Sequence, residues 1–303
     1  MKEPCVYIII LNYNGYSDTI ECIKSLERIE YRNYKIVVVD NKSTNESVKI
    51  IKSFILKNEK IKFIESEVNL GFSGGNNLGI EYALIHKAEY ICLLNNDTVV
   101  EPNFLGPLVN IMETDTNIGI SGGKIMYHKN KNIVWAAGGY IEENKAIGVN
   151  YGIDKNENDI NDEIREVTFL TGCLQLIRRD VFQNIGLYDD EYFLYMEDVD
   201  FCKRAFEYGY KLIYDPSSKI YHKVSASTGG TVSPMVVYYM TRNRLLFNSK
   251  YSKNKINSLR FYVFYFMKIL AEPVRKKVSY KYVMHAIKDF YNKKFGYKDL
   301  EKI

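Results

Sequence analysis

Residues 93–100 read LLNNDTVV, an apolar run that ends in two amides and the carboxylate of Asp97. A carboxylate at the end of a buried strand is costly unless it is paired or binds a cation. Carboxylate and amide oxygens suit a hard divalent cation, which could bridge to a diphosphate. The alternative interpretation is a solvated turn, because Asn95, Asn96, Asp97 and the following Thr are also good turn residues.

A second cluster, YMEDVDFCKRA at residues 195–205, is the densest group of acidic residues in the chain. Glu197 and Asp198 are adjacent, so at most one of them points straight into a given pocket. Such a carboxylate could act as a general base on a hydroxyl nucleophile. Asp200 and Arg204 are four residues apart and could form a helical ion pair. A solvated helix face is the alternative for the rest of the cluster.

Three weaker motifs also contain residues that could bind a ligand. Asp40, in VVVDNKSTNES (37–47), directly follows a buried strand, where it could contact a nucleoside or simply cap a helix. NLGFSGGNNLGI (69–80) enters a helix whose N-terminus would attract phosphate, or it forms a tight strand-to-helix turn. This segment matches neither the dinucleotide-binding motif nor a P-loop. His222 precedes a Ser/Thr/Gly-rich segment, although a lone His is more often structural.

The elements that would position these residues alternate along the first 125 residues. Apolar runs predict strands at 6–11, 35–40, 61–66, 90–95 and 118–125. Helices are predicted at 17–28, at 43–57 with a Ser43/Glu46 capping box, at 76–86 and from Pro102 onward. This alternation is typical of a parallel sheet covered on both faces, which binds ligands beyond the carboxyl ends of its strands.

The rest of the chain differs in composition. Residues 126–165 are rich in Asn, Lys, Asp, Glu and Gly, which predicts a surface insertion, and order resumes at 167. From residue 250 to the end there are 14 Lys and Arg against 4 Asp and Glu. This tail contains an apolar segment, 258–270, that is too short to span a bilayer. It could form a helix that lies on an anionic membrane.

Composition excludes several classes of protein. The chain is 46% hydrophobic and 26% charged, which is typical of a globular protein. Its five scattered Cys argue against a disulfide framework or a zinc site, and the start of the chain lacks a secretory signal. We therefore expect a cytoplasmic location. Nucleic-acid binding is not expected, because the first 249 residues carry 27 basic against 33 acidic residues.

In their order and spacing, these motifs resemble glycosyltransferase family 2, and within it the rhamnosyltransferase-like branch. The resemblance covers roughly residues 5–250 and rests on ILNYNG (10–15), VVVDNKS (37–43), NLGFSGGNNLGI (69–80), LLNNDTVV (93–100), TGCLQLIRRDVF (171–182), GLYDDEYFLYMEDVDFCKRA (186–205), His222 and YYMTRNRLLF (238–247). It implies an α/β fold of the GT-A type, a Rossmann-like nucleotide-diphospho-sugar transferase fold with a mostly parallel central sheet. The expected domain, 1–250, would comprise a donor-binding half (1–125) and an acceptor and catalytic half (126–250). A basic, aromatic helical extension (251–303) would follow.

The resemblance also implies roles for individual residues. Asp198 of the Glu197–Asp198 pair would be the catalytic base, and Asp97 and His222 would bind Mg²⁺ or Mn²⁺. The implied donor-binding residues are Asn12, Tyr13, Asn14, Asp40, Asn41, Gly71, Phe72, Gly74, Gly75, Asn76, Asn95, Asn96 and Arg242. Asn95 replaces the first acidic residue of the family's D-x-D motif and lacks its charge, so we expect modest metal affinity.

The function implied is transfer of a sugar, with inversion, from dTDP-rhamnose or a UDP-hexose to a hydroxyl of a glycan or lipid-linked acceptor. This would serve cell-surface polysaccharide synthesis, with the protein peripheral on the inner face of the membrane. One alternative is a nucleotidyltransferase, which would release pyrophosphate, but its Gly/Arg/Lys-rich signature is missing after the first strand. The other is a sugar-nucleotide-binding or scaffold protein with a decayed site, which Asn95 favours and the retained acidic residues oppose.

Overall fold

The structure is a computed structural model that describes residues 3–224, 233–252, 258–267 and 280–302. Its main sheet has ten strands, with the order β10-β12-β6-β11-β4-β1-β2-β3, while β5 pairs with β12 and β7 with β6. The strands are β1 (Val6–Asn12), β2 (Tyr34–Asp40), β3 (Ile61–Glu65), β4 (Tyr90–Asn95), β5 (Thr98–Val100), β6 (Ile118–Tyr127), β7 (Val134–Ala136), β10 (Arg165–Val167), β11 (Leu174–Arg178) and β12 (Lys211–His222). A separate hairpin pairs β8 (Gly139–Glu142) with β9 (Ile147–Asn150).

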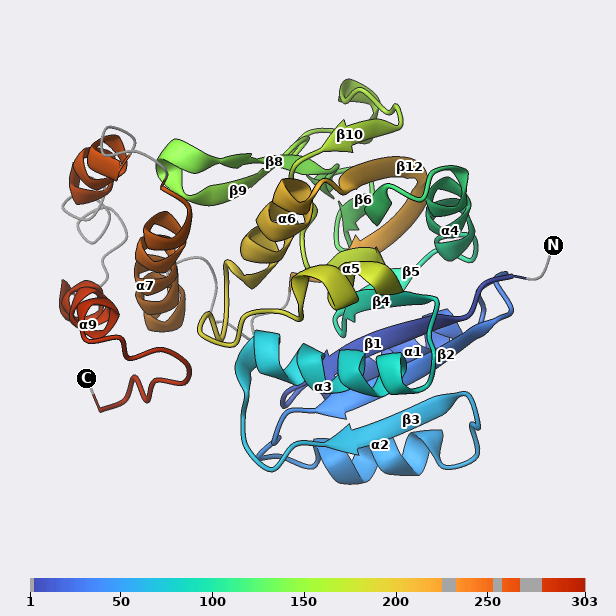
Figure 1. The fold of residues 1–303 in the computed structure, drawn as a ribbon. Coiled ribbons are helices and arrows are strands. Elements are labelled where there is room, and N and C mark those ends of the chain that lie inside the picture. The colour runs from blue at the N-terminus through green and yellow to red at the C-terminus, as the bar shows by residue number, and fades with distance from the viewer. Residues whose placement is uncertain (1–2, 225–232, 253–257, 268–279, 303) are drawn as a thin grey trace.

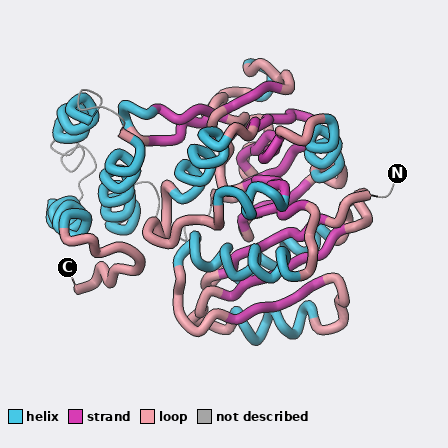
Figure 2. The backbone as a smooth tube through the Cα atoms, viewed as in Figure 1, coloured by secondary structure: helices cyan, strands magenta, loops and turns pink. Residues whose placement is uncertain are grey.

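Helices cover both faces of this sheet (Figures 1 and 2). They are α1 (Tyr16–Leu26), α2 (Ser47–Ile55), α3 (Gly71–Ile85), α4 (Leu105–Thr114), α5 (Arg179–Ile185), α6 (Glu197–Tyr208), α7 (Pro234–Tyr251) and α9 (Tyr280–Tyr291). Successive side chains of a strand point to opposite faces, so β1 contributes to two cores. Ile9 packs in the core that contains residues of α3, α5 and α6, whereas Ile8 and Ile10 pack in the core that contains residues of α1, α2 and α4.

The sheet is mostly parallel, as predicted, with an interruption that the sequence pattern did not indicate. Strands β4, β1, β2 and β3 are mutually parallel, and β12 is parallel to β6. Between them lies β11, which is antiparallel to both β4 and β6. The carboxyl ends of β1, β2 and β4 therefore meet at one edge, as predicted.

All five predicted strands are present within two residues of their predicted bounds, but three helix starts are wrong. The predicted Ser43/Glu46 capping box does not form, because α2 begins at Ser47 and the Ser43 hydroxyl donates to Asp40 Oδ2 at 2.7 Å. Helix α3 begins at Gly71, five residues before the predicted start. Helix α4 begins at Leu105 rather than at Pro102.

The predicted surface insertion at 126–165 is an ordered part of the fold, and its irregular composition was misleading. It contains β7, β8 and β9, and β7 joins the main sheet. Lys124, the residue two before this segment, is buried and its ammonium donates to Glu157 at 2.7 Å and to Asp162 at 2.6 Å. A buried ammonium is costly without such partners, so these ion pairs fasten the segment to the sheet.

The C-terminal helices stand beside the main sheet, at the left of the view in Figure 1. Helices α7 and α9 pack together, and the Tyr238 hydroxyl of α7 donates to Asp289 of α9 at 2.8 Å. Within the described residues, no helix is both long and apolar enough to cross a membrane. The predicted apolar segment is helical over 258–267, and its remainder lies outside the described residues.

Candidate active site

The strand ends bring Asp97 and His222 together. Asp97 follows β4, and His222 is the last residue of β12, which pairs there with β5 at Thr98. His222 Nε2 lies 3.0 Å from Asp97 Oδ1, and both residues are buried. Burial alone would lower the pKa of His222, but the Cys173 thiol and Asp97 raise it to about 10. His222 Nε2 and Asp97 Oδ1 are therefore within ion-pairing distance of each other.

The donor set of this pair fits a divalent cation that a diphosphate helps to bind. A carboxylate oxygen and an imidazole nitrogen already face each other, and both are ligands of Mn²⁺-type ions. Within the described residues, no group of three or more His, Cys, Asp or Glu could hold a metal alone. A cation here would need further oxygens, which is the usual arrangement when substrate phosphates complete the shell.

The second acidic cluster begins helix α6, where Glu197 and Asp198 are its first two residues. Asp198 Oδ2 accepts from the Gly172 N–H at 2.9 Å, and Oδ1 accepts from its neighbour Val199 at 2.8 Å. Burial raises the pKa of Asp198, although these N–H donors lower it part of the way. The nearby Arg204 forms the predicted helical ion pair, since its Nε donates to Asp200 at 2.8 Å.

Glu197 is the less satisfied member of the acidic pair. It is 5% exposed, and its Oε2 has no hydrogen-bond partner among the described residues. Burial and then the charge of Asp198 raise the pKa of Glu197 well above its ordinary value. A buried carboxyl beside a half-buried one, both with raised pKa values, is typical of sites that transfer protons.

Residues 172 and 173 connect the two clusters. The Gly172 N–H binds Asp198, and the Cys173 carbonyl accepts from the Asn95 N–H at 3.1 Å, two residues before Asp97. Burial raises the pKa of the Cys173 thiol, which the charge of His222 lowers and those of Asp97 and Asp198 raise. The general base candidate and the metal-binding candidates therefore lie around one short segment.

The donor-binding half contains a polar network that satisfies itself. Asn12 Nδ2 donates to Asp40 at 2.7 Å and to Ser43 at 3.1 Å, and its Oδ1 accepts from Thr19 at 2.8 Å. Thr19 in turn accepts from Asn96 Nδ2 at 3.0 Å. Asp40 is 1% exposed. Its interactions are those of a residue that fixes the loop after β2, so a nucleoside contact stays a prediction.

Asn14 and Tyr13 extend this network to the surface. Asn14 has left-handed backbone (φ 57°), and its Oδ1 accepts from the Thr44 N–H at 2.8 Å. The ring of Tyr13 is exposed. These two residues are therefore the accessible part of the predicted donor-binding set at the end of β1.

The glycines of residues 71–79 are buried, and close packing explains them without a ligand. A Cβ at Gly75 would lie 2.5 Å from Leu11 Cδ1, and one at Gly79 would lie 2.4 Å from Ile9 Cγ2. Gly71 has φ +72°, and a Cβ there would lie 2.2 Å from the Phe193 carbonyl oxygen. These residues let α3 approach the sheet, as the tight-turn alternative held.

Protein groups already occupy the N-terminus of α3. The Phe72 N–H donates to the Phe193 carbonyl at 2.6 Å, and the Gly71 N–H donates to Asn69 Oδ1 at 2.9 Å. Asn41 is also used internally, because its Nδ2 donates to the Gly71 carbonyl at 2.8 Å, and Asn76 Nδ2 donates to the Phe72 carbonyl at 2.9 Å. The Gly71 and Phe72 N–H groups are thus bonded to protein, and phosphate binding at this helix end stays a prediction.

The guanidinium of Arg242 is likewise bonded to protein groups. Its side chain is fully buried, and its guanidinium donates to the carbonyls of Glu191, Tyr192 and Gly296 at 2.8–2.9 Å. A diphosphate would have to displace these bonds. The predicted contact of Arg242 with the donor therefore stays a prediction.

Sequence reasoning assigned no role to four residues that shape the site. They are Gly172, Cys173, Trp135 and Lys223. The Trp135 ring meets His222 edge-on with centroids 4.6 Å apart, and Lys223 bridges to Asp18 at 2.6 Å and to Glu21 at 2.7 Å. The quoted motif TGCLQL contained Gly172 and Cys173, but its pattern does not say that the Gly172 N–H would donate to the Asp198 carboxylate.

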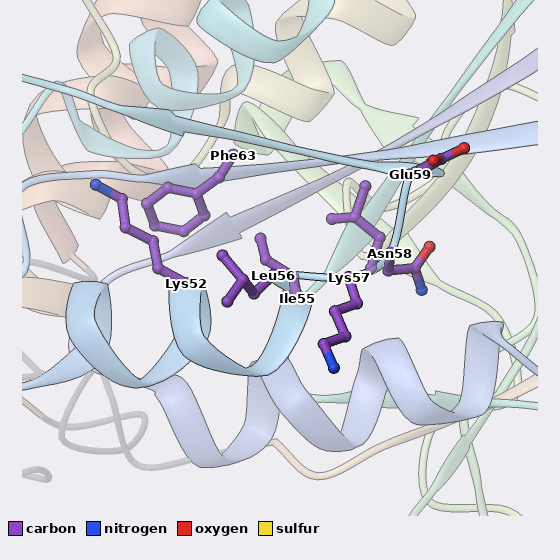
Figure 3. Close-up of a pocket in the computed structure, with 8 residues that line it drawn as sticks. Lys52, Ile55, Leu56, Lys57, Asn58, Glu59 and Phe63 are labelled. Carbon is purple, nitrogen blue, oxygen red and sulfur yellow. The ribbon is translucent and has the colours of Figure 1, made fainter.

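A shallow depression at the end of α2 lies apart from these groups (Figure 3). It is lined by Lys52, Ile55, Leu56, Lys57, Asn58, Glu59, Ile61 and Phe63. Ile61 begins β3, so the depression is at the opposite edge of the sheet from Asp97 and Asp198. Its residues do not form a recognisable catalytic cluster.

Comparison with known proteins shows the family to which this chain belongs. The family model "Glycosyl transferase family 2" matches residues 7–186. Because this match covers more than half of the chain, the protein belongs to glycosyltransferase family 2, which confirms the resemblance.

Two relatives support this assignment. The chain is 26% identical to the low-salt glycan biosynthesis hexosyltransferase Agl10 of Haloferax volcanii over 255 residues, which is 84% of this chain and 78% of that protein. It is 26% identical to the dTDP-rhamnosyl transferase RfbF of Shigella flexneri over 266 residues, covering 86% and 85%.

The solved structures share the fold at low sequence identity. GalNAc-T7 with UDP, GalNAc and Mn²⁺ superposes with a TM-score of 0.68 and 18% identity over 96% of this chain and 58% of that one. The mannosyltransferase PcManGT from Pyrobaculum calidifontis, in complex with GDP-Man and Mn²⁺, gives 0.61 and 13% over 97% and 89%. The GT-A fold predicted from the sequence is thereby confirmed.

Proposed function

We propose that the protein transfers a sugar, with inversion, from a nucleotide-diphosphate donor to a hydroxyl of a glycan or lipid-linked acceptor. The observation that carries this proposal is the convergence of Asp198 with the Asp97–His222 pair around Gly172 and Cys173. A general base and a diphosphate-binding site must lie close together when an acceptor oxygen replaces a diphosphate at one carbon.

In this reaction Asp198 accepts the proton of the acceptor hydroxyl as its oxygen bonds to the anomeric carbon. The bond from that carbon to the diphosphate oxygen breaks, and its electron pair leaves with the nucleoside diphosphate. The raised pKa of Asp198 makes it a stronger base than an exposed Asp. The Gly172 N–H, 2.9 Å from Oδ2, fixes the orientation of the carboxylate.

Asp97 and His222 are the residues that would hold Mg²⁺ or Mn²⁺. When bound, the cation supplies positive charge to the diphosphate as negative charge develops on it. The two Mn²⁺ complexes among the structural neighbours support divalent-metal use. Asn95 lies at the end of β4 and offers an uncharged amide, which supports modest affinity.

Two observations guide the choice of donor and location. The Shigella relative is named a dTDP-rhamnosyl transferase and the Haloferax relative a hexosyltransferase of glycan biosynthesis, which supports dTDP-rhamnose or a UDP-hexose as donor and a role in polysaccharide synthesis. The helix over 258–267 leaves Leu259, Val263 and Phe266 exposed. This apolar face and the surrounding basic residues support peripheral binding to the inner face of the membrane.

The deciding experiment measures nucleoside diphosphate release from a panel of sugar nucleotides with Mg²⁺, Mn²⁺ or EDTA. We expect release from one donor, and loss of that release with EDTA and in Asp97→Ala. Release of pyrophosphate would instead indicate a nucleotidyltransferase. Donor binding by calorimetry without turnover, even with glycan acceptors present, would indicate a binding or scaffold protein. Flotation with anionic liposomes at low salt tests the membrane step.

A further inference from the structure

The loop before α6, residues 189–196, is held in an unfavourable backbone conformation. Three of its non-glycine residues are left-handed: Phe193 (φ 62°), Tyr195 (φ 67°) and Met196 (φ 76°). Left-handed backbone is unfavourable for a non-glycine residue, and it persists only where the surrounding structure imposes it. Met196 directly precedes Glu197 and Asp198, so whatever imposes this conformation also places the two carboxylates.

Asn243 of α7 donates three hydrogen bonds to this loop. Its Nδ2 donates to the carbonyls of Tyr192 at 2.8 Å, Leu194 at 2.8 Å and Tyr195 at 2.7 Å. Asn243 is fully buried, and its Oδ1 accepts from Arg242 Nε at 3.0 Å. This bond orients the amide so that its nitrogen faces the loop.

Arg242 adds further bonds on the same side. Its NH2 group donates to the carbonyls of Glu191 at 2.9 Å and Tyr192 at 2.8 Å. Its NH1 group donates to Gly296 at 2.8 Å, which joins the C-terminal segment to the same loop. Two consecutive residues of α7 therefore satisfy the carbonyls of residues 191, 192, 194 and 195.

The remaining carbonyl of this stretch faces the donor-binding half. The Phe193 oxygen accepts from the Phe72 N–H at 2.6 Å at the start of α3. The Phe72 ring also packs close to Gly172, since a Cβ added at Gly172 would lie 3.3 Å from Phe72 Cε1. Gly172 is the residue whose N–H donates to Asp198. The loop thus joins α7, α3 and the candidate base.

We propose that Asn243, oriented by Arg242, is a positioning residue for the catalytic step. It touches neither substrate nor reacting atoms. It holds the left-handed loop so that Asp198 meets Gly172 and the acceptor hydroxyl in one geometry. This inference rests on the proposed function, because it assigns Asp198 the role of base.

The test compares Asn243→Ala with Asn248→Ala, a buried Asn on the same helix that lies outside the loop contacts. We expect kcat of Asn243→Ala to fall roughly 100-fold, because a displacement of about 1 Å at the base has that effect. The acid limb of the pH profile of kcat/KM should also shift, since the burial of Asp198 changes. The donor Kd should stay within about threefold, because the Asp97–His222 pair is untouched. Asn248→Ala should keep wild-type kcat and pH profile.

A rescue separates positioning from folding. Glycine adopts left-handed backbone without penalty, so Tyr195→Gly added to Asn243→Ala should restore part of kcat and return the pH profile toward wild type. Should Asn243→Ala fail to fold, Asn243→Ser, which keeps one donor, is measured in the same way.

Three outcomes would overturn the inference: an unshifted pH profile, equal losses in Asn243→Ala and Asn248→Ala, or no rescue by Tyr195→Gly. Failure of the proposed function is recognised separately, because wild-type protein would then release no nucleoside diphosphate and Asp198→Asn would change nothing.

Discussion

Two polar clusters, one around Asn12 and Asp40 and the other at the start of α6, differ in how fully their buried groups are hydrogen-bonded. In the donor-binding half, Asn12, Asp40 and Ser43 satisfy one another within 3.1 Å. In the catalytic half, Glu197 has a carboxylate oxygen without a partner among the described residues, and the preceding Met196 is left-handed.

This difference indicates where the protein stores unfavourable free energy. A fully bonded network stabilises the native state, whereas an unpaired buried carboxyl and left-handed backbone cost stability. Unpaired buried carboxyls with shifted pKa values are found most often at sites where a reaction changes the charge of a side chain. On the proposed function, we expect the Asn12–Asp40 network to act as a scaffold and the start of α6 to take part in the reaction. Three substitutions test this contrast.

The largest effect is expected at Asp198. Asp198→Asn keeps the shape of the side chain but removes the base, so transfer should fall roughly 10²- to 10⁴-fold. Steady-state assays of nucleoside diphosphate release measure this loss, and calorimetry should show a donor Kd within about threefold of wild type. Asp180→Asn, on the exposed side of α5, serves as the control and should keep full activity. If Asp198→Asn retained its activity, another residue would have to be the base.

The next effect concerns the donor-binding half. Asn12→Ala removes two donors to the buried Asp40–Ser43 pair and leaves Thr19 without its acceptor. We expect the free energy of unfolding to fall by roughly 2–3 kcal/mol, as measured by urea denaturation. The exposed Asn117→Ala should change it by less than about 0.5 kcal/mol. An unchanged stability in Asn12→Ala would refute the scaffold interpretation.

The smallest effect is a change of slope with pH at Glu197. Because burial raises its pKa in the folded state, the folded protein retains a proton that the unfolded chain releases as pH rises. The wild type should therefore lose stability with rising pH between the unfolded and folded pKa values, by at most about 1.4 kcal/mol per pH unit from this group.

Glu197→Gln is neutral at every pH and should flatten this slope, making the variant more stable than wild type at pH 8. Thermal unfolding at pH 5 and pH 8 measures the difference. The exposed Glu81→Gln should keep the wild-type slope. A wild-type slope in Glu197→Gln would show that Glu197 is not ionising in this range.

The sequence predicted the strands well because continuous apolar runs report burial directly. The ends of β1 and β4 were recognised from Asn12 and Asp97, and their convergence follows from parallel pairing. The antiparallel β11 was not predictable, because LQLIR has the same local pattern whichever way the strand runs. Strand direction is decided by connections and long-range pairing, which local periodicity does not record.

Within the site, residue types were easier to predict than their partners. The Gly-rich segment was interpreted through its helix end, but the carbonyl of Phe193, over a hundred residues later, occupies that end. Arg242 was assigned to a diphosphate because a cation suits an anion, whereas backbone carbonyls use its donors. These partners were not foreseen because hydrogen bonds to main-chain atoms leave no signature in side-chain identity.

The central place of β11 has a consequence for synthesis on the ribosome. Strand β4 is complete at Asn95, but its antiparallel partner β11 is made only at residues 174–178. Until then the apolar strand YICLLN presents an open edge, on which another nascent chain could add a strand. The same topology that places Cys173 beside Asn95 in the folded protein thus delays closure of the sheet, and we expect nascent chains that contain β4 but not yet β11 to depend most on a chaperone.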